Sequence, residues 1–257
     1  MLLQNLIRLL MRRKAAARFG IKFDRSTHFH LPAEIVIRGD RHRLWLPDEH
    51  GIKIAFVELL LDDCYGCRRI SKPVKTILDI GANVGLFGLM AREIFPDAVI
   101  HAYEPNPNLE PYLKHQAKIG SFECFMEAVG LDHGKVSLTF AADSVQTRSF
   151  NDQAGDIKQT AFREIIRRIG DSVDLVKMDC EGTEWPLFQD VESWSRVRHL
   201  SLEYHLWPGC SEKEALDKVR ALGFYIRYHK PLDGFGLIWA SRYGEAFRKK
   251  GESVAKS

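Results

Sequence analysis

The first residues that could do chemistry lie in a glycine-rich turn and at the end of the strand that follows it. The turn holds Asp79, Gly81, Asn83 and Gly85. A strand predicted over Lys75 to Ile80 leads into it, and a second predicted strand, Ala98 to Tyr103, ends at Glu104. A strand, turn, helix, strand unit with an acid roughly 20 residues after the glycines is typical of a site for a ribose-bearing cofactor at the carboxyl edge of a parallel sheet.

The polar residues of the turn narrow the choice of cofactor. A dinucleotide fingerprint has glycine where Asn83 stands, because a pyrophosphate approaches the backbone there. Asp79 would repel a phosphate, and could instead hold a ligand's ammonium group, directly or through water, with help from Asn83 and backbone carbonyls. Glu104 could accept both hydroxyls of a ribose, a contact of about 1.5 to 3 kcal/mol. A ligand with ammonium and ribose but no phosphate is S-adenosyl-L-methionine, which we predict as the cofactor.

A second group of titratable residues follows two later strands. They are Asp179, Glu181 and Glu184 after Val173 to Met178, and Glu203 and His205 at the end of Val197 to His205. A hydroxyl that is methylated must lose its proton, so we predict Asp179, Glu181 and His205 as catalytic. Asp179 would contact cofactor or substrate, and either Glu181 or His205 would accept the proton, His205 having the ordinary pKa nearer neutral. Glu184 is interpreted as a first-turn helix acid.

The same acids with one imidazole would also suit a divalent cation. Oxygen ligands with a single histidine nitrogen are typical of magnesium or manganese sites. The prediction assigns no metal ligand and keeps a cation beside Asp179, Glu181, Glu203 and His205 as an alternative.

Four short motifs resemble the FkbM family of S-adenosylmethionine-dependent methyltransferases. They are DIGANVG (79–85), YEPNP (103–107), EAVG (127–130) and DLVKMDCEGTEWPLF (174–188), within a match over roughly Leu59 to His205. The resemblance implies a cofactor site formed by Asp79, Gly81, Asn83, Gly85, Glu104, Pro105, Ala128 and Asp179, and a fourth-strand motif at Lys177, Asp179, Glu181, Gly182 and Glu184. It also implies O-methylation of a hydroxyl on a sugar, polyketide, glycan or similar small molecule.

The fold expected from the resemblance is α/β, a Rossmann-like class I methyltransferase with a seven-stranded, mostly parallel sheet of order 3-2-1-4-5-7-6. The sequence pattern agrees, because strands and helices alternate and two strands in succession, Phe224 to His229 and Phe235 to Ala240, end the chain as an antiparallel insertion. Other expected elements are helices over Gly51 to Asp62, Asn108 to Ile119, Thr160 to Ile169 and Glu212 to Leu222, a strand over Glu123 to Ala128, and a hairpin or edge strand within Leu131 to Asp143.

Composition limits the domain count and the partners. A chain of 257 residues suits one domain, predicted over 51–257, with a small N-terminal elaboration over 1–50. The net charge of +3 and the lack of a basic stripe do not indicate a nucleic-acid partner. Five scattered cysteines suit a reducing cytoplasm, and the pair Cys64 and Cys67 is interpreted as ordinary thiols.

The N-terminal region lies outside the recognised motifs. Met1 to Arg18 predicts an amphipathic helix, with leucines on one face and basic residues toward the other. It is expected to pack on the domain or on a second subunit in a homodimer, with peripheral contact to an anionic membrane as the alternative. Phe23 to Leu46 predicts a β-hairpin that turns at Gly39-Asp40 and forms part of a lid.

Two other function classes remain open at the level of sequence. One is a nicotinamide-dependent oxidoreductase, against which Asn83 argues. The other is a module that binds the cofactor without catalysis, which would not need the acids after the fourth strand.

Overall fold

The protein is described here from a computed structural model, which covers residues 2–21, 31–71, 73–139, 148–152, 154–181 and 183–243. Gly182 of the fourth-strand motif lies outside these ranges. The same is true of residues 22–30 in the predicted hairpin region and of 140–143 at the end of the later predicted hairpin.

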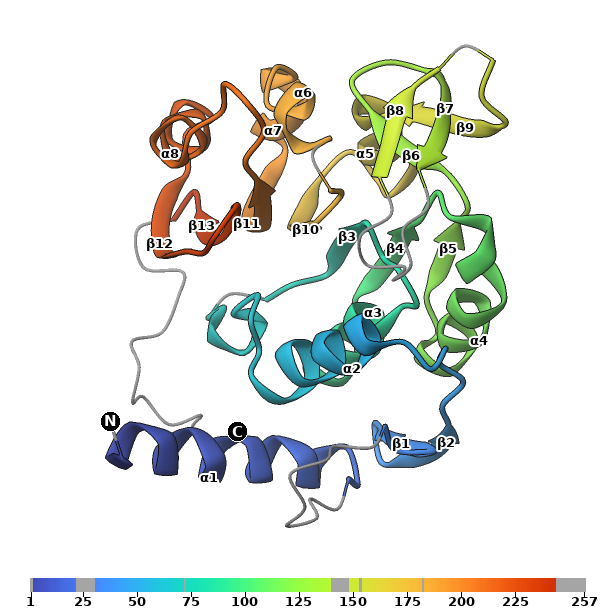
Figure 1. The fold of residues 1–257 in the computed structure, drawn as a ribbon, viewed down its shortest axis with the longest axis vertical. Helices are drawn as coiled ribbons and strands as arrows, with labels where there is room; N and C mark the ends of the chain where they lie inside the picture. The colour runs from blue at the N-terminus through green and yellow to red at the C-terminus, as the bar shows by residue number, and fades with distance from the viewer. Residues whose placement is uncertain are drawn as a thin grey trace.

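The centre of the fold is a seven-stranded sheet with the order β12-β13-β11-β10-β3-β4-β5 (Figure 1). Its strands are β3 (Thr76–Ile80), β4 (Val99–Tyr103), β5 (Glu123–Phe125), β10 (Val173–Met178), β11 (Val197–His205), β12 (Tyr225–Pro231) and β13 (Phe235–Ser241). The five strands from β11 to β5 are parallel, and β13 runs antiparallel to both of its neighbours. Numbered along the chain, this is the order 3-2-1-4-5-7-6, so the predicted fold is confirmed.

Apolar cores cover both faces of this sheet. One contains residues of α2 (His50–Phe56), α3 (Leu86–Ile94) and α4 (Glu110–Gly120), and the other residues of α5 (Phe162–Arg168), α6 (Glu184–Leu187), α7 (Val191–Ser195) and α8 (Glu212–Ala221). Side chains alternate along a strand, so Ile77 and Leu175 belong to the first core, and Leu78 and Val176 to the second. All six residues of β10 are buried, which agrees with an apolar run that only Asp174 and Lys177 interrupt.

A second sheet accounts for two wrong boundaries. It contains β6 (Ala128–Gly130), β7 (Gly134–Thr139), β8 (Arg148–Asn151) and β9 (Ile157–Ala161) in the order β6-β9-β7-β8. The strand predicted to reach Ala128 ends at Phe125, and Ala128 instead begins β6. The helix predicted from Thr160 begins at Phe162, because Thr160 pairs with Val129 in β9. Within the range expected to form a hairpin or edge strand, the described residues contain one strand, β7, which pairs antiparallel with β8 and β9; the strands that flank the Asp-x-Gly turn, β6 and β7, do not pair with each other.

The segment between the hairpin and β3 is less regular than predicted. The helix expected over Gly51 to Asp62 is α-helical only to Phe56 and continues as the π-helical segment η1 (Val57–Leu61). Short 3₁₀ turns follow at η2 (Cys67–Arg69) and, after β4, at η3 (Pro107–Leu109).

The N-terminal elaboration packs onto the helical layer. The hairpin of β1 (Glu34–Ile37) and β2 (Asp40–Arg43) turns at Arg38-Gly39, one residue earlier than predicted. Ile35 and Ile37 are buried in the core that contains α3, and the His115 ring of α4 hydrogen-bonds the Arg43 carbonyl at 2.8 Å. The predicted lid role is wrong for the described part of the hairpin, because none of its residues lines the cavity described below.

The helix α1 (Leu2–Arg18) forms as predicted and lies along one edge of the molecule (Figure 1). It packs on η1 through the second half of its length, where Ala15 and Ala16 are buried, as is Phe19 just beyond it. None of the helices in the described ranges has the length and apolar character that crossing a bilayer requires.

A buried cation joins the ends of β3 and β10. The Lys177 ammonium donates to the Gly81 carbonyl and lies 3.2 Å from Oδ1 of Asp79, which is wholly buried. Gly81 has φ 76°, and a Cβ there would lie 1.7 Å from the Asp179 carbonyl oxygen. Only glycine therefore lets the turn approach the end of β10 so closely.

Replacing Gly81 tests this close approach. Gly81→Ala should lower the free energy of unfolding by about 2 to 4 kcal/mol, because it adds a steric clash to the strain of a positive φ. Urea unfolding measures the change. Gly39→Ala is the matched control, because Gly39 has φ 91° with no atom within 4 Å of its Cβ position, and it should lose only about 1 kcal/mol. Equal losses at the two positions would contradict a tight turn.

Removing Lys177 tests the buried ion pair. Lys177→Met should destabilise the protein by about 3 to 5 kcal/mol at pH 8, because it leaves the Asp79 carboxylate buried without a counter-charge. Burial already raises the pKa of Asp79, although Lys177 opposes it, and loss of Lys177 raises that pKa further. A group with a raised folded-state pKa loses stability as pH rises through it, so the defect should be smaller at pH 5 than at pH 8.

The double variant Asp79→Asn with Lys177→Met removes both charges and serves as the control. It should be more stable at pH 8 than Lys177→Met alone, and its deficit should not depend on pH over this range. A pH-independent deficit in Lys177→Met would show that lost packing, and not the unpaired charge, accounts for the change.

Candidate functional site

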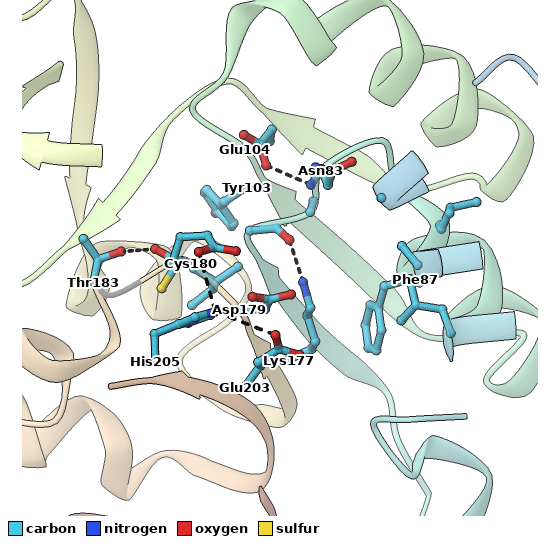
Figure 2. Close-up of a pocket in the computed structure, with 18 of the residues that line it drawn as sticks. Asn83, Phe87, Tyr103, Glu104, Lys177, Asp179, Cys180, Thr183, Glu203 and His205 are labelled. Atoms are coloured by element: carbon cyan, nitrogen blue, oxygen red, sulfur yellow. Dashed lines mark hydrogen bonds and ion pairs between the residues drawn. The ribbon is translucent and has the colours of Figure 1, made fainter. Parts of the chain in front are cut away.

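A cavity of about 770 Å³ lies at the carboxyl ends of β3, β4, β10 and β11 (Figure 2). The predicted site residues on its wall are Gly81, Asn83, Glu104, Pro105, Ala128, Asp179, Glu181 and His205. The structure thus brings together residues that are up to 124 positions apart in the chain. Residues from α2, η1 and β13 complete the wall, among them Glu58 and Phe235.

Two predicted cofactor residues do not reach this wall. Asp79 is wholly buried behind the turn beside Lys177 and does not line the cavity, so of its two predicted routes to a ligand's ammonium group, directly or through water, only the one through water stays a prediction. Its place in the structure is to hold the turn. Gly85 begins α3 with φ 84°, and a Cβ there would lie 3.0 Å from Leu113 Cδ1, so this glycine is required by packing and not by ligand contact.

Glu104 is placed for the role predicted for it. One carboxylate oxygen accepts a hydrogen bond from the backbone N–H of Asn83 at 2.8 Å (Figure 2). The other accepts one from the backbone N–H of Asn106 at 2.9 Å. Each oxygen keeps a lone pair for a further donor, as the two hydroxyls of a ribose would require. Burial raises the pKa of Glu104 to about 7, against the lowering effect of these two hydrogen bonds.

Asn83 has a structural contact of its own. Its φ is 49°, and its side-chain Oδ1 accepts a hydrogen bond from the Val84 N–H at 2.8 Å. The amide oxygen therefore stabilises the left-handed turn, while the residue still lines the cavity.

His205 lies at the centre of the acidic cluster. Its Nδ1 is 3.2 Å from Glu184 Oε1, and its Nε2 is 3.6 Å from Glu181 Oε2 and 3.7 Å from Glu203 Oε1. Phe235 lies 6.1 Å away with its ring nearly parallel to the imidazole. The histidine is thus enclosed by carboxylates on both ring nitrogens.

These carboxylates change the charge expected on His205. Burial, the largest single influence, lowers its pKa, but the hydrogen bond and charge of Glu184 together with the charges of Asp179 and Glu181 outweigh it and raise the pKa to about 9. The prediction of a base with a near-neutral pKa is therefore wrong. In the free protein at neutral pH the ring is an imidazolium ion, which has no lone pair to accept a proton.

Glu184 does more than stabilise a helix end. It is wholly buried at the start of α6, where its Oε1 accepts a hydrogen bond from the Cys180 N–H at 3.0 Å and pairs with His205. Its carboxylate therefore orients the imidazole, a role that the first-turn interpretation did not include.

The backbone also directs the cluster. Glu181 has φ 52°, a left-handed conformation that costs a non-glycine residue about 1 kcal/mol or more. Asp179, Glu181 and His205 each offer one atom within 4.8 Å of the others, a spacing at which they could hold a divalent cation. The alternative of a cation thus has a geometric basis at these three residues.

Tyr65 is a site residue that the sequence did not reveal. Its hydroxyl donates a hydrogen bond of 2.9 Å to Asp179 Oδ2, and burial raises its pKa, which keeps the donor protonated. It stands between Cys64 and Cys67, which are both free thiols whose pKa values are raised by burial. The raised pKa values favour the neutral form of both thiols, and the contact of this segment with Asp179 comes from the tyrosine, which no motif marked.

Comparison with known proteins agrees with this geometry. Residues 79–226, more than half of the chain, match the family model of the methyltransferase FkbM domain. The 31-O-demethyl-FK506 methyltransferase FkbM of Streptomyces tacrolimicus is 28% identical over 219 residues, covering 66% of this chain and 80% of that protein. Methyltransferase sdnD of Sordaria araneosa is 22% identical over 215 residues, covering 65% and 80%.

Among solved structures, fibrillarin of Aeropyrum pernix with natively bound S-adenosyl-L-methionine superimposes with a TM-score of 0.44 at 15% identity, over 68% of this chain and 76% of that one. The family match confirms the prediction of an enzyme that uses S-adenosylmethionine and contradicts the alternative of a nicotinamide-dependent oxidoreductase. The chain belongs to the FkbM family of methyltransferases.

Proposed function

We propose that this enzyme transfers a methyl group to a hydroxyl oxygen of a small molecule or glycan. The observation that carries the proposal is that one cavity is lined both by Gly81, Asn83 and Glu104 and by Asp179, Glu181 and His205. The printed name of one relative, a 31-O-demethyl-FK506 methyltransferase, describes transfer to an oxygen in that protein and supports the same reaction type here.

The residues divide into those that position and those that move a proton. S-adenosylmethionine, when bound, supplies an electrophilic methyl group; the new O–CH₃ bond forms as the C–S bond breaks and its electron pair stays on sulfur. Glu104 would accept the ribose hydroxyls, and Asp179, held by Tyr65, would contact cofactor or acceptor. Alignment of the acceptor oxygen supplies most of the rate, about 7 to 11 kcal/mol in favourable cases.

Glu181 is the proton acceptor in this scheme. It lines the cavity, and the imidazolium of His205, whose raised pKa shows that it is already protonated, lies 3.6 Å from the Glu181 carboxylate. The hydroxyl proton therefore passes to the Glu181 carboxylate, and His205 acts as a positioning residue that stabilises the negative charge beforehand.

Glu181→Gln tests this assignment. It should lower kcat by roughly 10²- to 10⁴-fold, because the amide cannot accept the proton, while binding of S-adenosylhomocysteine stays within about twofold. Release of S-adenosylhomocysteine with a panel of sugars and polyketide alcohols measures turnover. Glu192→Gln on the exposed surface of α7 is the control and should leave kcat unchanged.

The same panel separates the proposed function from its alternative. A wild-type protein that binds S-adenosylhomocysteine but turns over none of the hydroxyl compounds would favour the non-catalytic module. Full activity in Glu181→Gln would refute its role without touching the methyl-transfer proposal.

Cofactor binding should depend on pH through Glu104. Because its folded-state pKa is about 7, the ionised form that accepts two ribose hydroxyls is depleted as pH falls from 8 to 6. The affinity for S-adenosylhomocysteine should therefore fall over that range, and binding near pH 7 should release a proton. Calorimetry in buffers of different ionisation enthalpy measures both effects.

Glu104→Gln is the matching variant for that measurement. It should bind S-adenosylhomocysteine roughly 10- to 100-fold more weakly at pH 8 and show no loss between pH 8 and 6, because glutamine does not titrate. An unchanged pH profile in this variant would assign the dependence to another group.

A further inference from the structure

The first half of α1 exposes a band of large apolar side chains. Their exposed fractions range from 39% to 56%, and the residues are Leu6, Ile7, Leu9, Leu10 and Met11. Scattered single residues of this kind are normal on a protein surface, but a cluster on consecutive turns of one helix marks an interaction site.

The opposite side of the same helix is the one that packs on the domain. Ala15 and Ala16 are buried, and Arg12 forms two hydrogen bonds of 2.6 Å from Nε and Nη2 to the carboxylate of Asp62. Successive residues of a helix are about 100° apart around its axis. On this basis the mean angular position of Arg12, Ala15 and Ala16 is roughly opposite that of the five exposed apolar residues. Docking on η1 therefore fixes the helix and directs its apolar band away from the protein.

The charge of α1 distinguishes between two partners for this apolar band, a second copy of the helix and a lipid surface. The 17 residues of α1 include Arg8, Arg12, Arg13, Lys14 and Arg18 and no acidic residue. Arg13 and Lys14 are exposed directly after the apolar band, where long basic side chains can extend to lipid headgroups while their stems remain apolar. A second copy of this helix would bring two positive faces together, whereas an anionic lipid surface complements them.

We propose that α1 binds the surface of an anionic membrane, with its apolar band inserted among the acyl chains and its basic residues at the headgroups. The helix is joined to η1 and, through it, to α2, and both supply residues to the cavity wall, including Glu58 and Ile54. Membrane binding would thus bring the cavity close to the lipid surface. The inference concerns location and is independent of methyl transfer.

Co-sedimentation of the full-length protein with vesicles tests the proposal. The protein should sediment with vesicles rich in phosphatidylglycerol and stay in the supernatant with pure phosphatidylcholine, and binding should weaken at ~0.5 M salt. The double variant Leu6→Gln with Leu10→Gln should bind anionic vesicles roughly tenfold or more weakly. Its melting temperature should match that of the wild type, because both side chains are more than half exposed.

Val191→Gln is the matched control, because Val191 is an exposed apolar residue at 59% on a different helix, α7. It should bind vesicles as the wild type does. A wild type that stays in the supernatant with anionic vesicles, or a double variant that sediments fully, would overturn the proposal. A dimer that dissociates on Leu6→Gln with Leu10→Gln, without vesicle binding by the wild type, would assign the band to a second copy instead.

Discussion

The ion pair between Lys177 and Asp79 is the interaction on which the cofactor side of the molecule depends. The parallel strands β3 and β10 end side by side there. Without Lys177, the buried carboxylate of Asp79 would have no positive charge beside it. A buried carboxylate without a counter-charge costs several kcal/mol, so removing Lys177 alone should destabilise the fold more than removing both charged groups. Lys177 also donates a hydrogen bond to the Gly81 carbonyl, so one ammonium group holds the glycine turn against the end of β10. The turn residues that line the cavity therefore lie beside Asp179 and the acids that follow it.

The charges around the cavity determine which kind of ligand it favours. Lys177 offsets Asp79, and His205 is shared among Glu181, Glu184 and Glu203, so the cavity keeps an excess of carboxylate. Glu203 responds with a raised pKa, caused first by burial and then by the charge of Asp179. Such an environment favours a positively charged ligand, and a cofactor that carries both an ammonium and a sulfonium group meets that condition.

The sequence predicted those parts of the structure that depend on local pattern. The boundaries of β10 and β11 are correct to the residue, and the nearly continuous apolar run of β10 agrees with a strand buried on both faces. Those of β5, β6 and β9 are wrong, because Val129 and Thr160 pair across 31 positions and no local pattern records that pairing. The same limit applies to the site: its membership was largely predictable, whereas the burial of Asp79 and the charge of His205 are set by distant partners.

The residues that line the cavity lie partly inside and partly outside the range of the family match. The cofactor turn, Glu104 and the acids up to His205 lie within residues 79–226, whereas Glu58 and Tyr65 precede this range and Phe235 follows it. Tyr65, outside the match, donates a hydrogen bond to Asp179, inside it. Residues of η1, also outside the match, line the same cavity as the glycine turn. The cavity wall therefore combines residues within the family match, among them those proposed to bind the cofactor, with residues from segments outside the match. If the matched residues bind the cofactor and Glu181 takes the acceptor's proton, as proposed, the segments outside the match are the part of the wall that is free to differ in shape and charge and so to select the acceptor.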